Sequence, residues 1–294
     1  MKKGISSEST CDVCGGTMRA RCEQHSLQCA DCGFWKSTFV PLPNTLRDDK
    51  AVKADCHQEA FEGLRRLNWA RILDVLGNVL PLSNCTLCDI GCAYGGFLRL
   101  AAERGAKVVG VEANAQFAMA GRKAGLNIAE GIFPDGLASG ERFDILTFHD
   151  VLEHIPRPRD VLVKCREHLR PNGLLAITVP SSRGLFYRLS VALRRIGLRG
   201  PYDRMWQRQF YTPHVSYFHE TNLRTLSEGC GFKLIHSEAL RSVQLSGLWG
   251  RLRCDTQAPV LFSATVYLGV VLLAPLLRVV PSDCLFQVYQ RCEP

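Results

Sequence analysis

Short apolar runs alternate with amphipathic helical stretches along most of this chain, and this alternation restricts the possible folds more than any other feature. Strand-length apolar runs separated by helices are typical of a parallel sheet covered on both faces, so we expect an α/β fold. The strands are expected over 86–90, 107–111, 143–148, 174–179, 232–237 and 284–290, and the helices over 59–80, 97–104, 115–124 and 161–169.

The cysteines are concentrated near the N-terminus, where five of the 14 lie within the first 32 residues. Cys11 and Cys14 form one C-x-x-C pair, and Cys29 and Cys32 form a second. Two such pairs at this separation predict a zinc ribbon in which four thiolates bind one structural Zn²⁺, with unmetallated thiols as the alternative. Residues 1–10 have no apolar core, so we expect no secretory signal and no disulfide framework.

We place a domain boundary near Asn44, which gives a ribbon-like segment over 1–44 and a main domain over 45–294. The chain is 46% hydrophobic and 22% charged, values of an ordinary globular protein that exclude disorder and a polytopic membrane bundle. The main domain is therefore long enough to bury a core of its own.

A glycine-rich turn at 89–96 follows the first expected strand and opens a helix, with Glu112 placed 21 residues after Gly91. Glycines let a backbone approach a ligand closely, and an acid at the end of the next strand can bind the two hydroxyls of a ribose. The same residues nearly satisfy the dinucleotide pattern, and a turn that needs glycine only for tight packing is a third interpretation.

The segment Asp89–Gly95 (DIGCAYG) resembles motif I of class I S-adenosylmethionine (SAM)-dependent methyltransferases, with Ala93 in place of the middle glycine. Further segments resemble that family in the expected order, namely 108–112, 143–155, 169–174, 214–218 and 231–232. The resemblance covers roughly 58–294 and implies a Rossmann-like, seven-stranded sheet whose last strand is antiparallel. Within that family the chain is similar to bacterial sugar, glycolipid and quinone methyltransferases, and those of sugar and glycolipid pathways often carry a similar ribbon.

The resemblance also implies roles for individual residues. Glu112 would bind the ribose of SAM, and His149 would line its methionine side. The turn would hold the methionine portion through Asp89, Gly91, Ala93 and Gly95. Glu130 and Asp135 are equal candidates for the acid that contacts adenine.

Methyl transfer from SAM needs an in-line acceptor and, for a hydroxyl, a group that removes its proton. Histidine suits that task at neutral pH, and His214 and His154 are the catalytic candidates, with His214 the stronger base. Asp150, Glu153 and His154 resemble the E-x-x-E-H ligand set of metal-dependent methyltransferases, which implies a possible Mg²⁺ site. Capping and core packing are the structural alternatives for Glu153, His154 and His214.

Two segments interrupt the alternation. Seven arginines and one aspartate fall within 183–208, so this basic amphipathic insert carries most of the net charge of +8. The segment 258–277 has no charged residue and is about long enough to span a bilayer. A span would prevent 284–290 from rejoining the sheet, so we favour an interfacial helix or hairpin on an anionic membrane surface over a buried helix pair or a true span.

These observations predict an enzyme that transfers a methyl group from SAM to a lipid- or nucleotide-linked sugar or another membrane-associated metabolite. We expect it in the cytoplasm, peripheral on the inner membrane face, with no nucleic-acid partner because the basic residues lie in one segment with few aromatics. An NAD-dependent oxidoreductase and a non-catalytic SAM-binding module that uses the ribbon to hold a partner are the alternatives.

Overall fold

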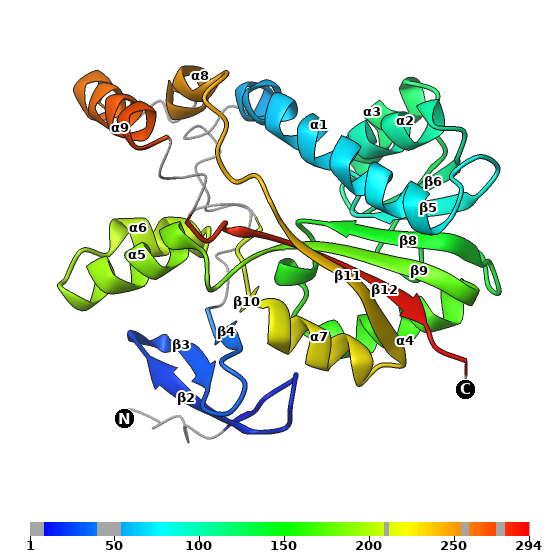
Figure 1. Ribbon diagram of the computed structural model, residues 1–294, viewed down its shortest axis with the longest axis horizontal. Coiled ribbons are helices and arrows are strands. Elements are labelled where there is room, and N and C mark those ends of the chain that lie inside the picture. The colour runs from blue at the N-terminus through cyan, green and yellow to red at the C-terminus, as the bar shows by residue number, and fades with distance from the viewer. Residues whose placement is uncertain (1–8, 40–53, 209–211, 254–258, 275–279, 294) are drawn as a thin grey trace.

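A seven-stranded sheet forms the centre of the computed structural model, which describes residues 9–39, 54–208, 212–253, 259–274 and 280–293 (Figure 1). Its strands are β5 (Thr86–Ile90), β6 (Lys107–Glu112), β7 (Ile128–Glu130), β8 (Phe143–His149), β9 (Leu169–Pro180), β11 (Phe232–Leu240) and β12 (Cys284–Arg291). Their order is β11-β12-β9-β8-β5-β6-β7, and β12 runs antiparallel to both of its neighbours. The predicted sheet with an antiparallel last strand is confirmed.

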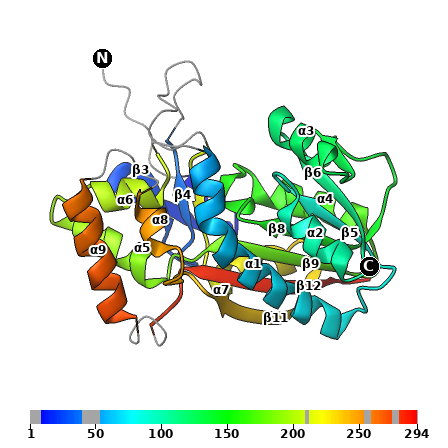
Figure 2. The same cartoon turned by 90° about the horizontal axis from the view of Figure 1, so that it is seen from above.

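Helices cover both faces of the sheet, as the alternation predicted (Figures 1 and 2). One face packs against α1 (Ala54–Val79), α2 (Gly96–Glu103) and α3 (Ala115–Lys123), and the other against α4 (Pro158–His168) and α7 (Glu220–Glu228). Side chains such as Ile72 and Phe97 fill the first layer, and Leu162 and Leu223 fill the second. β5 is buried along most of its length because helices lie on both of its faces.

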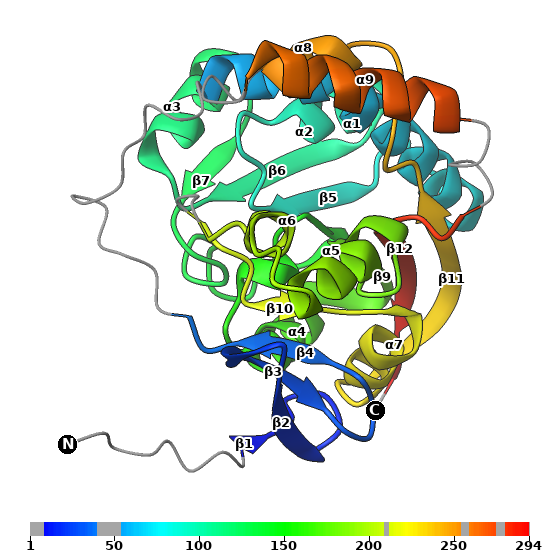
Figure 3. The same cartoon turned by 90° about the vertical axis from the view of Figure 1, so that its left-hand side faces the viewer.

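The N-terminal segment forms a second, smaller sheet from β1 (Ser9–Thr10), β2 (Thr17–Arg21), β3 (Glu23–Cys29) and β4 (Trp35–Ser37). Its fifth strand, β10 (Ser216–Tyr217), comes from the main domain and pairs with β4 (Figure 3). Phe34 packs on Phe218 with ring centroids 5.1 Å apart, so the ribbon shares the main core. The predicted boundary near Asn44 lies outside the described residues.

Four further helices lie at one end of the molecule, on the left in Figures 1 and 2. The basic insert forms α5 (Leu185–Arg195) and α6 (Gly200–Met205), and the apolar segment contributes α9 (Val260–Leu273), which packs on α8 (Leu248–Arg253). Among the described helices, none has the length and hydrophobicity needed to cross a bilayer.

Candidate active site

The glycine-rich turn between β5 and α2 has a backbone that only glycine adopts without strain at two of its positions. Gly91 and Gly95 have φ values of 72° and 76°, in the left-handed region. A β-carbon on Gly91 would lie 2.5 Å from a methyl of Val151, and one on Gly95 would lie 2.2 Å from Leu126. Ala93 also has a positive φ, 48°, so the residue that departs from the family pattern keeps the glycine-like backbone.

Glu112, at the end of β6, ties this turn to the neighbouring strand. One carboxylate oxygen accepts a hydrogen bond from the Ala93 amide at 2.9 Å, and the other accepts from the Asn114 amide at 2.8 Å. Only 9% of Glu112 is exposed. A carboxylate has about four lone-pair sites, so acceptor capacity remains for the two hydroxyls of a ribose.

A buried polar group lies behind the turn, at the carboxyl ends of β5 and β8. Asp89 accepts a hydrogen bond from the Thr147 hydroxyl at 2.7 Å, and its Oδ1 lies 4.0 Å from His149 Nε2. Burial raises the pKa of Asp89 to about 7 and lowers that of His149 to about 3. His149 Nε2 has no hydrogen-bond partner among the described residues, so its imidazole has an unused polar atom at this edge of the sheet.

The features at this edge suit a nucleoside with a charged amino-acid tail. α2 begins at Gly96, its first turn contains no acidic residue, and no side chain caps it, so its first amides can bind a carboxylate. The structure thus brings together Asp89, Gly91, Ala93, Glu112 and His149, whose roles the sequence predicted. Sequence reasoning missed Thr147, which bonds to Asp89, and Thr178, whose hydroxyl lies 3.3 Å from His149 Nδ1.

The two candidate adenine acids lie beyond Glu112. Glu130 stands directly beside Glu112 in the β6–β7 register, but its side chain is exposed and pairs with Arg122 at 3.2 Å. Asp135 is exposed in the loop after β7. The geometry leaves both residues as candidates.

Glu153, His154 and His214 form a second cluster, in which all three donor atoms lie within 4.8 Å of one another. The Oε1 atom of Glu153 is 3.9 Å from Nε2 of both imidazoles. Glu153 belongs to η3 (Leu152–His154), whereas His214 precedes β10 by two residues. The long-range pairing of β10 therefore brings together residues that are about 60 positions apart in the sequence.

Hydrogen bonds fix the tautomer of both histidines in this cluster. His154 Nδ1 must donate to the carbonyl of Pro213 at 3.0 Å, because a carbonyl only accepts. The hydroxyl of Tyr217 donates to Met205 O, so its oxygen accepts from His214 Nδ1 at 3.1 Å. Both Nε2 atoms consequently direct lone pairs toward Glu153.

Two imidazole nitrogens and a carboxylate oxygen are a donor set for a divalent cation. Burial raises the pKa of Glu153 well above its usual value and lowers the pKa values of His154 and His214, so burial favours the uncharged form of each group. Asp150, which the sequence grouped with Glu153 and His154, follows β8 and is not a member of the cluster. Its place is taken by His214, which the E-x-x-E-H spacing does not contain.

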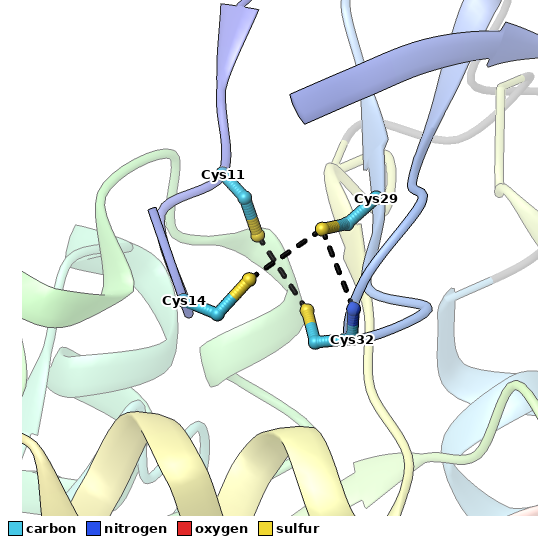
Figure 4. Close-up of side chains that lie close together, drawn as sticks. All are labelled: Cys11, Cys14, Cys29 and Cys32. Atoms are coloured by element: carbon cyan, nitrogen blue, oxygen red, sulfur yellow. Dashed lines mark hydrogen bonds between the residues drawn. The ribbon is translucent and has the colours of Figure 1, made fainter. Parts of the chain in front are cut away.

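The four predicted ribbon cysteines converge at one point (Figure 4). Cys11 and Cys32 have their sulfurs 3.6 Å apart, and Cys14 and Cys29 have theirs 3.5 Å apart. Tetrahedral Zn–S bonds of about 2.3 Å give sulfur separations of about 3.8 Å, so the arrangement fits one Zn²⁺. Amides of Val13 and Cys32 donate to sulfurs of the set, as expected for turns that stabilise thiolates.

The basic insert has a role that its composition did not indicate. Arg208 pairs with Glu23 on β3, and Arg194 lies 3.6 Å from the same carboxylate. These two arginines therefore hold the ribbon, whereas Arg188, Arg195 and Arg199 are exposed.

Comparison with known proteins shows which family this chain belongs to. A family model described as a methyltransferase domain matches residues 61–237, more than half of the chain. The chain belongs to the methyltransferase domain family. Together with the motifs of the turn and the order of the sheet, this match identifies a class I SAM-dependent methyltransferase and disfavours the dinucleotide interpretation of the turn.

Relatives of this methyltransferase include two ubiquinone biosynthesis O-methyltransferases. The protein of Serratia proteamaculans is 29% identical over 120 residues, which cover 38% of this chain and 50% of that protein. The protein of Cereibacter sphaeroides is 31% identical over 148 residues, which cover 47% of this chain and 59% of that one. This methyltransferase thus spans about half the length of the curated relatives that it matches.

Solved structures share the fold. A phosphoethanolamine N-methyltransferase 2 of Haemonchus contortus in complex with SAM matches with a TM-score of 0.56 and 16% identity, covering 81% of this chain and 56% of that one. A magnesium protoporphyrin IX methyltransferase of Synechocystis with bound S-adenosylhomocysteine matches with a TM-score of 0.51 and 12% identity, covering 81% and 86%.

Proposed function

We propose that this protein transfers the methyl group of SAM to a hydroxyl of a small, membrane-associated acceptor. The proposal rests on the turn at Gly91–Gly95, which Glu112 links to β6 by hydrogen bonds. The Glu112 carboxylate can accept further hydrogen bonds from the hydroxyls of a ribose. Calorimetry tests it directly: SAM and S-adenosylhomocysteine should bind and NAD should not. Absence of affinity for both nucleosides would overturn the proposal.

A lipid- or nucleotide-linked sugar is the acceptor that we favour, and a quinone precursor is the second candidate. The relatives named for ubiquinone biosynthesis support a hydroxyl acceptor. Turnover with each class of acceptor, followed by release of S-adenosylhomocysteine, separates the candidates. Binding of SAM without turnover on any acceptor in a lysate would instead support a non-catalytic module.

In the proposed reaction, Glu112 holds the ribose and the turn positions the sulfonium, while the histidine cluster handles the proton of the acceptor. His214 presents an unprotonated Nε2 at neutral pH because burial lowers its pKa to about 3. Tyr217 keeps that ring in one tautomer. His214→Ala should retain SAM binding and lose most turnover, and unchanged turnover would remove His214 from the mechanism.

As an alternative to His214 acting as the base, Glu153, His154 and His214 would hold a divalent cation, which would lower the pKa of an acceptor hydroxyl. Nitrogen-rich sets favour first-row transition ions over the Mg²⁺ expected from the sequence. Titration of metal-stripped protein with Co²⁺ or Mn²⁺ tests this point. His154→Ala should weaken binding of the metal ion. His168 lies outside the cluster, so His168→Ala should leave the metal affinity unchanged.

We further propose that Cys11, Cys14, Cys29 and Cys32 bind a structural Zn²⁺. The sulfur separations near 3.5 Å support it, and a closed tetrathiolate leaves no open coordination position for catalysis. Purified protein should contain one zinc per chain. Cys14→Ser should lose it, whereas Cys22→Ser should retain it, because Cys22 is not part of the cluster.

The apolar segment supports a peripheral membrane contact. On α9, Leu261 and Leu272 are 80% and 78% exposed, and at the end of α5 Ile196 is 73% exposed. Exposed Arg188 and Arg195 on α5 add positive charge at the same end of the molecule (Figure 2). Apolar side chains beside arginines suit an anionic lipid surface. The protein should sediment with phosphatidylglycerol vesicles and not with phosphatidylcholine vesicles.

A further inference from the structure

A polar cavity of about 310 Å³ opens between the ribbon and the main domain, beside the second cysteine pair. Arg19 and Arg21 line it from β2, and Arg183 and His219 line it from the main domain. Asp31 is the one acidic residue among the residues that line this cavity. Three guanidinium groups face one acid, so the side chains at this junction present an excess of cationic donors.

The fold builds this cavity from distant segments. Arg19 and Arg21 are two residues apart on a strand. Ser181 pairs with Phe218 in an isolated bridge, and the Ser182 amide donates to Phe218 O at 2.7 Å. This pairing brings Arg183 beside His219.

His219 connects the cavity to the ribbon. Its Nε2 donates to Cys32 O at 2.9 Å, and the residue is only 6% exposed. This buried hydrogen bond to the Cys32 carbonyl holds the main-domain wall of the cavity, which contains His219, against the ribbon.

The three arginines differ from an arginine with a structural role at the same junction. Arg159 donates to the carbonyls of Asp12 and Val13 at 3.1 and 2.8 Å, so its guanidinium is used to dock the ribbon. Within the described ranges, the guanidinium groups of Arg19, Arg21 and Arg183 make no hydrogen bond or ion pair. Their donors are available to a ligand.

We propose that this cavity binds a phosphoryl group, and specifically the diphosphate of the acceptor. Planar guanidinium donors bind phosphate oxygens bidentately, and several of them suit a multiply charged group. Arg183 follows the carboxyl end of β9, and β9 runs parallel to β8, so the cavity belongs to the same edge of the sheet as the SAM turn. The inference rests on the proposed function, because it names what the acceptor carries.

Charge compensation of the ribbon is the rival explanation. A zinc bound by four thiolates carries a formal charge of about −2, and Cys29 and Cys32 also line the cavity. The arginines would then stabilise the zinc centre and bind nothing. The two explanations differ in whether the zinc-loaded protein binds phosphate, and in whether zinc is lost when an arginine is removed.

Calorimetry on the zinc-loaded full chain, with S-adenosylhomocysteine present, tests the inference with three probes: inorganic pyrophosphate, UDP-glucose and farnesyl diphosphate. Arg183→Ala and, separately, Arg21→Ala should each weaken binding of pyrophosphate at least about tenfold. Arg241→Ala removes an exposed arginine beyond the end of β11 and should change nothing. Zinc content and the thermal melting temperature are measured for each variant. Arg21 is exposed on β2, so Arg21→Ala is expected to fold even if Arg183→Ala does not.

Binding that both cavity variants weaken and that Arg241→Ala preserves supports the inference. Tighter binding of UDP-glucose than of pyrophosphate assigns the diphosphate to a nucleotide-linked acceptor, and tighter binding of farnesyl diphosphate assigns it to a lipid-linked one. No binding of any probe, equal losses in the control variant, or loss of zinc with unchanged phosphate affinity would overturn it. S-adenosylhomocysteine affinity in the same experiment reports separately on the proposed function.

Discussion

Replacing Glu112 by glutamine is the most direct perturbation of the proposed cofactor site. The carboxylate accepts from two backbone amides, at 2.9 and 2.8 Å, in a position that is only 9% exposed. Hydrogen bonds to a charged group contribute about 1.5–3 kcal/mol each. Glutamine keeps one acceptor oxygen without the charge and turns its NH₂ group toward the other amide. Glu112→Gln should therefore cost roughly 2–4 kcal/mol of unfolding free energy.

Urea unfolding and thermal melting in the absence of ligand measure this loss. For a chain of 294 residues the midpoint should fall by roughly 3–7 °C. Glu130→Gln is the matched control, because Glu130 lies beside Glu112 in the sheet register but is exposed and paired with Arg122. Removing an exposed ion pair should change stability by less than about 1 kcal/mol.

SAM affinity then separates the two roles of Glu112. The variant should bind SAM roughly 10–100-fold more weakly, because both ribose hydroxyls lose a charged acceptor. A variant as stable as the wild type would mean that the bonds to the turn do not form in solution. A destabilised variant that binds SAM with wild-type affinity would show that the ribose lies elsewhere.

Other changes test the turn, its buried acid and the apolar helix. Gly91→Ala places a β-carbon at a φ of 72° and 2.5 Å from Val151, and should lower the free energy of unfolding in urea by about 2–4 kcal/mol. Adding Val151→Ala should recover only the part of this loss that is due to the steric clash. Burial raises the pKa of Asp89 to about 7. The folded state thus holds a proton that the unfolded state releases, and the wild type should lose stability relative to Asp89→Asn as pH rises from about 4 to about 7. A constant difference in unfolding free energy between pH 4.5 and 8 would contradict this. Leu261→Asp with Leu272→Asp should abolish sedimentation with anionic vesicles, and retained sedimentation would exclude α9 as the contact.

Local patterns carried the parts of the fold that the sequence predicted correctly. The turn at Gly91–Gly95 needs glycine for its own backbone, and Cys11 and Cys14 lie close because they are three residues apart, so both features are visible without knowledge of the rest of the chain. Helix periodicity placed α1 to within a few residues, over Ala54–Val79 against the predicted 59–80. The strand predicted over 174–179 is longer in the structure, where β9 covers Leu169–Pro180.

Long-range pairing determined what the sequence left out. β7 has only three residues, and it pairs with β6 through backbone hydrogen bonds, which do not depend on side-chain identity and so leave no pattern in the sequence. Arg194 and Arg208 were visible in the sequence only as part of a basic segment, because Glu23, with which they form ion pairs, lies more than 170 positions away. The grouping of His214 with Glu153 likewise depends on tertiary structure, so the spacing of acids around Glu153 indicated Asp150 instead.

The ribbon and the histidine cluster are one structural unit, although the sequence divides them near residue 44. β4 follows the second cysteine pair and hydrogen-bonds to β10, and β10 carries Tyr217, the residue that fixes the tautomer of His214. The Ser37 amide also donates to Val215 O at 2.9 Å, and the Val215 amide donates to Glu153 O at 2.8 Å. Backbone hydrogen bonds thus connect the segment after the second cysteine pair to the backbone carbonyl of Glu153. A ribbon so connected holds in place the residues for which we propose a role in proton transfer, so loss of the ribbon's fold should disturb the histidine cluster as well.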